Sequence, residues 1–135
     1  MTMSNMEVNK DNARAFFDCF IAQDFDTVNH LLAEDIIYTM PGKFPFAGTL
    51  KGRMAYLDQV IKRFQGHVSD AKMDILQMTA EDNRVAIEAV GHFQFKDGIL
   101  YENNYHFLFH FDEDSKIKKM VEYMDTYSMT KTFSV

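Results

Sequence analysis

A carboxylate at Asp125 stands in a strand pattern whose other members are apolar or aromatic. One alternating phase of the last apolar run contains Asp125 together with Ile117, Val121, Tyr123 and Tyr127. Alternate residues of a strand point to the same side of a sheet, so the pattern predicts that Asp125 faces the core. Because burying an unpaired carboxylate is costly, we expect it at the open end of the core, in a pocket. There its pKa would rise, which suits a general acid or base near neutral pH.

Hydroxyl and amide side chains on the same predicted face could hold a substrate oxygen. In the run 100–111, the phase that must face the core reads Tyr101, Asn103, Tyr105, Phe107, Phe109 and Phe111. Asn103 and Tyr105 could therefore bind substrate beside Tyr123. Tyr38, at the end of an earlier apolar run, could join them.

Histidines are weaker candidates for the site. His92, His106 and His110 fall in the outward phase of their runs, where a histidine is usually a surface residue. For His92 the opposite, inward phase of the run reads Val85, Ile87, Ala89, Gly91, Phe93 and Phe95. No pair of them has metal-ligand spacing with an accompanying carboxylate, so no metal and no other cofactor is expected. Cys19 is the single cysteine, which excludes an intrachain disulfide.

Three helical patterns come before the sheet and must help to position these residues. Apolar residues recur with helical spacing over Asp11–Gln23, with Asn9 or Asp11 as N-cap, and residues 1–9 are expected to be loosely ordered. A shorter pattern follows Asp24 and ends near Ala33. A third begins at Met54 and ends where Gly66 offers a C-cap.

One short strand pattern comes before the third helix, and the remaining strand patterns follow it. Ile36–Tyr38 predicts a short strand that ends at Pro41 and Gly42. From Ser69 the apolar period becomes two, with breaks at 81–83, 96–98 and 112–115. We expect four antiparallel strands and an α+β fold in which the sheet curls over the helices, as a single domain of 1–135.

Composition excludes several classes of function. The chain has 135 residues, a net charge of -6 and scattered basic residues, which argues against a nucleic-acid partner. No apolar stretch approaches the length of a membrane span, and the first ten residues lack an apolar signal region. We therefore expect a cytoplasmic protein without a membrane partner.

Several motifs, in order, resemble those of ketosteroid isomerases, SnoaL-like polyketide cyclases and other relatives of nuclear transport factor 2. They lie at 22–26, 31–35, 40–42, 48–53, 101–107 and 122–126. The resemblance covers nearly the whole chain. It implies a cone-shaped, curved, antiparallel or mixed sheet wrapped around three N-terminal helices, a fold also called cystatin-like. Since this fold hosts many activities, function must come from the site.

The catalytic residues of ketosteroid isomerase do not carry over. Its oxyanion tyrosine would fall at Phe16, its general-base aspartate at Met40 and its protonated aspartate at Phe107. Phe and Met supply neither a base nor an oxyanion donor. Steroid isomerisation by that mechanism is not expected, and the three side chains would instead line the substrate pocket.

The resemblance to SnoaL-like cyclases implies a role for Asp125. These enzymes rely chiefly on an aspartate of the last strand, and Asp125 resembles it. An epoxide hydrolase of this fold would need a second pocket carboxylate and an arginine that bridges the pair. The candidates Glu88 and Arg84 do not fall on the predicted inward face of their strand.

The leading hypothesis is an acid/base enzyme that acts on a small, apolar, oxygen-bearing ring compound, with Asp125 as the proton-transfer group. Two alternatives are a non-catalytic domain that binds a hydrophobic ligand and a protein-interaction module. The resemblance also implies a homodimer, formed through an outward row of Glu102, Asn104, His106 and Leu108.

Overall fold

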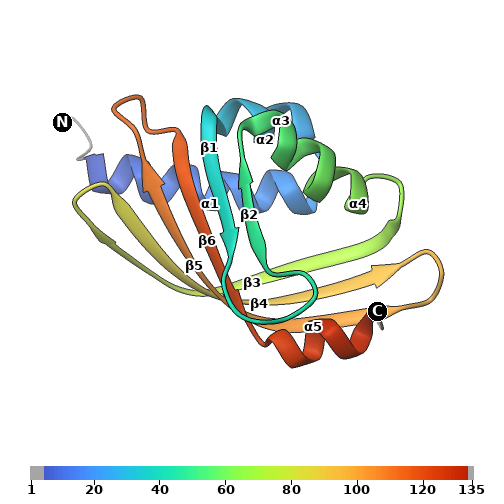
Figure 1. Cartoon of the computed structure of the whole chain (residues 1–135). Coiled ribbons are helices and arrows are strands. Elements are labelled where there is room, and N and C mark those ends of the chain that lie inside the picture. The colour runs from blue at the N-terminus through green and yellow to red at the C-terminus, as the bar shows by residue number, and fades with distance from the viewer. Residues whose placement is uncertain (1–4, 134–135) are drawn as a thin grey trace.

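Six strands form one curved mixed sheet in the computed structural model, which describes residues 5–133 (Figure 1). Their order is β2-β1-β6-β5-β4-β3, and all neighbours are antiparallel except β1 and β6. The strands are β1 (Leu32–Met40), β2 (Gly48–Lys51), β3 (Val68–Glu81), β4 (Arg84–Phe95), β5 (Leu100–Phe111) and β6 (Ile117–Met124). The predicted α+β fold and the four-stranded meander are confirmed.

The helices lie against this sheet, with α1 crossing behind the strands in Figure 1. They are α1 (Asn5–Ile21), α2 (Phe25–Leu31), α3 (Arg53–Tyr56), α4 (Lys62–Phe64) and α5 (Thr126–Thr132), and a π-helical turn, Leu57–Ile61, joins α3 to α4. Strand β2 and helix α5 were not predicted, because both are short and carry little periodic signal. Within residues 5–133, every helix is too short or too polar to cross a bilayer.

Helix α1 is longer than its apolar pattern predicts. Its inner face buries Ala13, Phe16 and Phe17, as expected. It begins at Asn5, however, so that residues 5–9, expected to be loosely ordered, are helical. Neither Asn9 nor Asp11 caps the helix, because both lie inside it. Residues 1–4 of the predicted loose segment lie outside the described residues.

Helix α2 begins as the sequence predicts. The side chain of Asp24 accepts a hydrogen bond of 3.2 Å from the Thr27 backbone N–H. This is the usual N-cap interaction, which satisfies one of the free donors of the first turn. The helix ends at Leu31, and the chain enters β1 at once.

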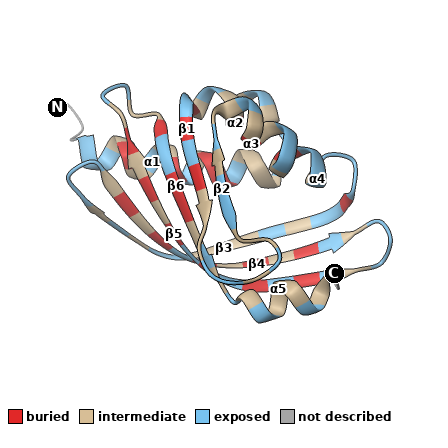
Figure 2. Ribbon diagram, in the orientation of Figure 1, coloured by how far each residue is buried: buried red, intermediate tan, exposed pale blue. Residues whose placement is uncertain are grey.

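The inward phases of β4 and β5 are also confirmed. Burial alternates strictly along most of both strands, and Figure 2 shows the buried positions as red bands. The inner face of β5 carries the aromatic side chains, and Phe109 is fully buried against Phe16 and Phe17 of α1. The sheet and α1 therefore enclose a core of aromatic rings.

The predicted phase of β6 is wrong. Phe111 pairs with Ile117, but His110 pairs with Lys119, so β6 contains an irregularity at Lys118. One extra residue moves every later side chain to the opposite face. Beyond this point the even-numbered residues, Met120, Glu122 and Met124, lie opposite the inward residues Phe109, Phe107 and Tyr105.

The third helical segment has a similar shift. A π-helical turn places residues five apart on one face, and Tyr56 and Ile61 are accordingly both buried. Met54, expected on the apolar face, has 74% of its surface exposed. Tyr56 takes the inward position instead.

Candidate functional site

A cavity of about 390 Å³ lies between the concave face of the sheet and the helices. Its volume is in the lower part of the range of small-molecule sites. Most of its lining is apolar, and the polar side chains that reach it are Tyr38, Tyr56, Arg63, Tyr101, Tyr105 and Glu122. A small, largely apolar molecule with few polar groups would suit such a space.

Glu122 of β6 is the carboxylate of this cavity. Desolvation in the apolar surroundings raises the pKa of Glu122 from 4.5 to about 7, although a hydrogen bond from Tyr38 partly opposes the rise. The Tyr38 hydroxyl donates this bond to Glu122 Oε1 over 3.2 Å. Near neutral pH the carboxyl is thus divided between its acid and its base form, and can both donate and accept a proton.

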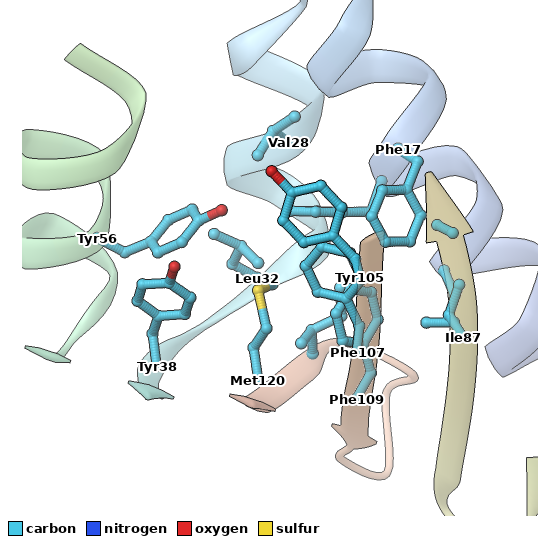
Figure 3. Packing of buried hydrophobic residues seen from close by; sticks show 14 of the residues in the cluster. Phe17, Val28, Leu32, Tyr38, Tyr56, Ile87, Tyr105, Phe107, Phe109 and Met120 are labelled. Atoms are coloured by element: carbon cyan, nitrogen blue, oxygen red, sulfur yellow. The ribbon is translucent and has the colours of Figure 1, made fainter. Parts of the chain in front are cut away.

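Three buried tyrosines surround the same space. Tyr38 and Tyr56, from β1 and α3, have ring centroids 5.1 Å apart, and they lie together across from Tyr105 of β5 (Figure 3). Desolvation holds the pKa of all three phenols well above 10. At neutral pH the hydroxyls therefore stay protonated and can act as hydrogen-bond donors.

Tyr56 is the tyrosine whose hydroxyl is available. Among residues 5–133, Tyr38 is bonded to Glu122, Tyr105 is hydrogen-bonded with Tyr101, and no protein group bonds the hydroxyl of Tyr56. A substrate oxygen in the cavity could accept its proton.

The structure does not place Asp125 in the cavity. Asp125 is exposed and stands at the N-cap of α5, where its carboxylate accepts a hydrogen bond of 3.1 Å from the Ser128 N–H. The expectation that it faces a pocket is therefore wrong, because the irregularity at Lys118 reverses the phase of β6 and the strand ends at Met124.

Two other predicted residues also lie away from the cavity. Tyr123 is 51% exposed and points to the opposite face from Glu122. Asn103 is buried but has a structural role: its amide donates to the Tyr101 hydroxyl at 2.7 Å and to the Asp125 carbonyl at 3.0 Å. Its Oδ1 accepts from the Asp125 N–H at 2.9 Å. Asn103 thus ties β5 to the start of α5.

The remaining predicted residues all line the cavity: Phe16, Tyr38, Met40, Tyr105 and Phe107. That they contact a substrate stays a prediction. The three positions that replace the catalytic groups of ketosteroid isomerase thus provide apolar walls.

The outward histidines do not contribute to this cavity. His92 contacts Glu102 over 3.0 Å and Asp74 over 3.5 Å. Glu88 is exposed, and Arg84 pairs with Glu81 and Asp82. No group of three or more potential metal ligands occurs within the described part of the chain.

Sequence reasoning missed Glu122 and Tyr56. When the side-chain alternation of β6 is counted from Ile117, Glu122 falls on the outward face. The role of the pocket carboxylate was therefore assigned to Asp125, three residues later. Tyr56 lies outside the regular helical spacing because of the π-helical turn. The segment 122–126 does contain Glu122 as a second carboxylate beside Asp125, but its position opposite the inward Phe107 is visible only in the structure.

Comparisons with known proteins bear on the family and the fold of the chain. The family model described as SnoaL-like domain matches residues 13–120. No curated protein matches the chain.

Solved structures share the fold. An NTF2-like protein of unknown function from Burkholderia pseudomallei is 18% identical, with a TM-score of 0.81 and coverage of 98% of this chain and 100% of the other. Bal32a from a soil-derived mobile gene cassette is 23% identical, with a TM-score of 0.82 and coverage of 96% and 98%. An LEH-like epoxide hydrolase from M. tuberculosis is 20% identical, with a TM-score of 0.77 and coverage of 96% and 91%.

Proposed function

This chain belongs to the SnoaL-like domain family, and we propose that it is an acid/base enzyme acting on a small, largely apolar, oxygen-bearing ring compound. The observation that carries the proposal is the carboxyl of Glu122, which lies in an aromatic cavity with a pKa of about 7. An acid/base group works best when its pKa is close to the working pH. Glu122 therefore takes the role that the sequence assigned to Asp125.

The reaction would begin with ionised Glu122. Its carboxylate accepts a proton from a carbon next to a carbonyl group, the electron pair of the broken C–H bond forms a carbon–carbon double bond, and the π electron pair of the carbonyl moves to its oxygen. The Tyr56 hydroxyl donates a hydrogen bond to the oxyanion that forms. Protonated Glu122 then returns the proton at the same or another carbon. Isomerisation, cyclisation and dehydration all use such a step.

Tyr38 would act as a positioning residue for Glu122. Its hydrogen bond holds one carboxylate oxygen, Oε1, and leaves the other for substrate. The apolar walls exclude water from the carboxyl, which strengthens every electrostatic interaction inside.

The proposal is tested by deuterium exchange into cyclic ketones. Tetralone and related bicyclic ketones and enones are incubated with the protein in D₂O, and loss of the α-proton signal is followed by NMR. We expect catalysed exchange that increases with pH to a plateau above about 7, because the ionised form of Glu122 is the base. Glu122→Gln should slow the catalysed exchange at least about 100-fold.

Asp125→Asn is the matched control, because it also neutralises one carboxylate and Asn is an equally good N-cap. It should leave the exchange rate within about twofold of wild type. Exchange that depends on Asp125 and not on Glu122 would contradict the proposal. So would a Glu122 pKa near 4.5 in an NMR titration.

A non-catalytic binding domain is the second candidate, favoured by the predominance of apolar side chains in the lining. Under this alternative the same ketones bind to the protein but do not exchange, and Glu122→Gln leaves their affinity unchanged or increases it. An internal cavity of this size gives less support to the third candidate, a protein-interaction module.

A further inference from the structure

Among the residues of 5–133 that line the cavity, Arg63 is the one with a permanently cationic side chain. It lies in α4 and is exposed to solvent, so this residue belongs to the open side of the cavity rather than to its interior. The next residue, Phe64, packs on Phe93 and Phe95 of β4 with ring centroids 5.4 Å and 6.1 Å apart. These contacts fix the end of the helical segment against the sheet and hold Arg63 at the rim.

The other three arginines of the chain have partners within the described residues. Arg14 donates to Met78 Sδ, Arg53 to the Leu32 carbonyl and Arg84 to Glu81 and Asp82. Arg63 has no hydrogen bond or ion pair within residues 5–133.

The absence of a partner is not due to a lack of nearby carboxylates. Asp58, one helical turn before, forms an ion pair of 3.1 Å with Lys62 instead. The chain as a whole is acidic, with a net charge of -6. An unpaired arginine at the rim of an apolar cavity can therefore form an ion pair with a negatively charged group of a ligand.

We propose that the pocket takes an amphipathic acid, whose apolar ring system enters the aromatic cavity while its carboxylate is bound by Arg63 at the rim. This inference rests on the proposed function, because it assumes that the cavity is the ligand site. Arginine suits the task, since its planar guanidinium stays charged and can bind a carboxylate through two parallel hydrogen bonds.

The position of Glu122 agrees with this orientation. A ligand carboxylate inside the cavity would lie close to the Glu122 carboxyl and would lose its hydration. A ligand carboxylate at the rim stays hydrated and can form an ion pair with Arg63. The charged end of the ligand would thus stay outside, and its oxygen-bearing ring would reach Glu122 and Tyr56.

The experiment compares naphthylacetate with naphthylacetamide, which have nearly the same shape and differ in charge. Their fluorescence can be followed in this protein because it contains no Trp. Binding is measured at about pH 6, where Glu122 is mostly neutral and the probe is ionised. Wild type should bind the acid about fivefold more tightly than the amide, and added salt should reduce the difference.

Arg63→Gln should make the affinities of the two probes equal and leave that of the amide unchanged. The matched control is Lys51→Gln, which removes the same charge from an exposed residue of β2 that neither lines the cavity nor pairs with a carboxylate within residues 5–133. It should preserve the preference for the acid. Arg63→Lys should keep part of it.

Equal binding of the two probes to wild type would overturn the inference and leave the proposed function standing. An equal loss of preference in Arg63→Gln and Lys51→Gln would also overturn it, because the effect would then come from the long-range electrostatic field. Failure of both probes to bind would contradict the use of the cavity as a ligand site, and this inference with it.

Discussion

The hydroxyl of Tyr38 on β1 donates a hydrogen bond of 3.2 Å to Glu122 Oε1 on β6. The two residues are 84 positions apart in the chain and meet because β1 and β6 are parallel neighbours in the sheet. Burial raises the pKa of Glu122, and this bond lowers it. The protonation of the site near neutral pH is set by the balance between the two effects.

Tyr38→Phe should raise the pKa of Glu122 further, because it removes the hydrogen bond that stabilises the ionised carboxylate. The measurement is an NMR titration of the carboxyl carbons. Tyr56→Phe is the control: Tyr56 is buried beside Tyr38 but does not bond Glu122, and its loss should leave that pKa nearly unchanged. A lower pKa in Tyr38→Phe would contradict the role assigned to the bond.

The stability of the protein should fall as the pH increases from about 4.5 to about 7. Because the pKa of Glu122 is higher in the folded chain, the folded state binds more protons than the unfolded state in this window. The difference between 4.5 and about 7 corresponds to about 3 kcal/mol. Chemical denaturation of wild type and Glu122→Gln as a function of pH should show that the variant lacks this part of the decline. Parallel pH profiles would show that Glu122 is not buried.

Asn103→Ala should lower the free energy of unfolding by about 1–3 kcal/mol, because it removes the side-chain partners of the Asp125 backbone N–H and carbonyl and one hydrogen bond to the Tyr101 hydroxyl. Asn104→Ala, at the exposed neighbouring position of β5, is the control and should change it by less than about 0.5 kcal/mol. Urea denaturation provides the measurement. Equal effects of the two variants would refute the proposed link between β5 and α5.

Gly91→Ala should destabilise the protein by about 1–3 kcal/mol through overpacking. A Cβ at this position would lie 2.8 Å from ring atoms of both Phe93 and Tyr105, closer than van der Waals contact allows. Thermal unfolding would detect the change, with Val90→Ala on the other face of β4 as the control. An unchanged melting temperature in Gly91→Ala would mean that the two rings can move aside.

The homodimer stays a prediction. Glu102, Asn104, His106 and Leu108 do lie on the outer face of β5, as the phase of the strand requires. Sedimentation equilibrium should give about twice the chain mass of 15.7 kDa. Leu108→Glu should shift the protein to monomers, whereas Leu76→Glu, on the edge strand β3, should not. A wild-type monomer would refute the prediction.

Much of the fold follows from local patterns in the sequence. The inner faces of β4 and β5 could be read from alternation, because each strand keeps an uninterrupted period of two. The buried face of α1 could be read from its helical spacing, and the start of α2 from Asp24. These periodic patterns depend only on residues that are close in the chain, so they can be recognised without knowledge of the tertiary structure.

The candidate site was predictable only in part. Phe16, Met40 and Phe107 were expected at the pocket and do line it. Asn103 was expected there too, but its polar atoms are used to hold the backbone of Asp125. Whether a buried polar group serves a ligand or the fold depends on which partners the packed structure brings within reach.

The sequence alone therefore indicated an aromatic pocket with one carboxylate and assigned that role to Asp125, whereas the tertiary structure places Glu122 there. The irregularity at Lys118 decides which of these two residues faces inward. Successive residues of a strand point to opposite faces, so one extra residue moves every later side chain to the other face. Likewise the π-helical turn brought Tyr56 inward in place of Met54. Both are small backbone adjustments that the packing of the complete core selects, and neither leaves a local signal in the sequence.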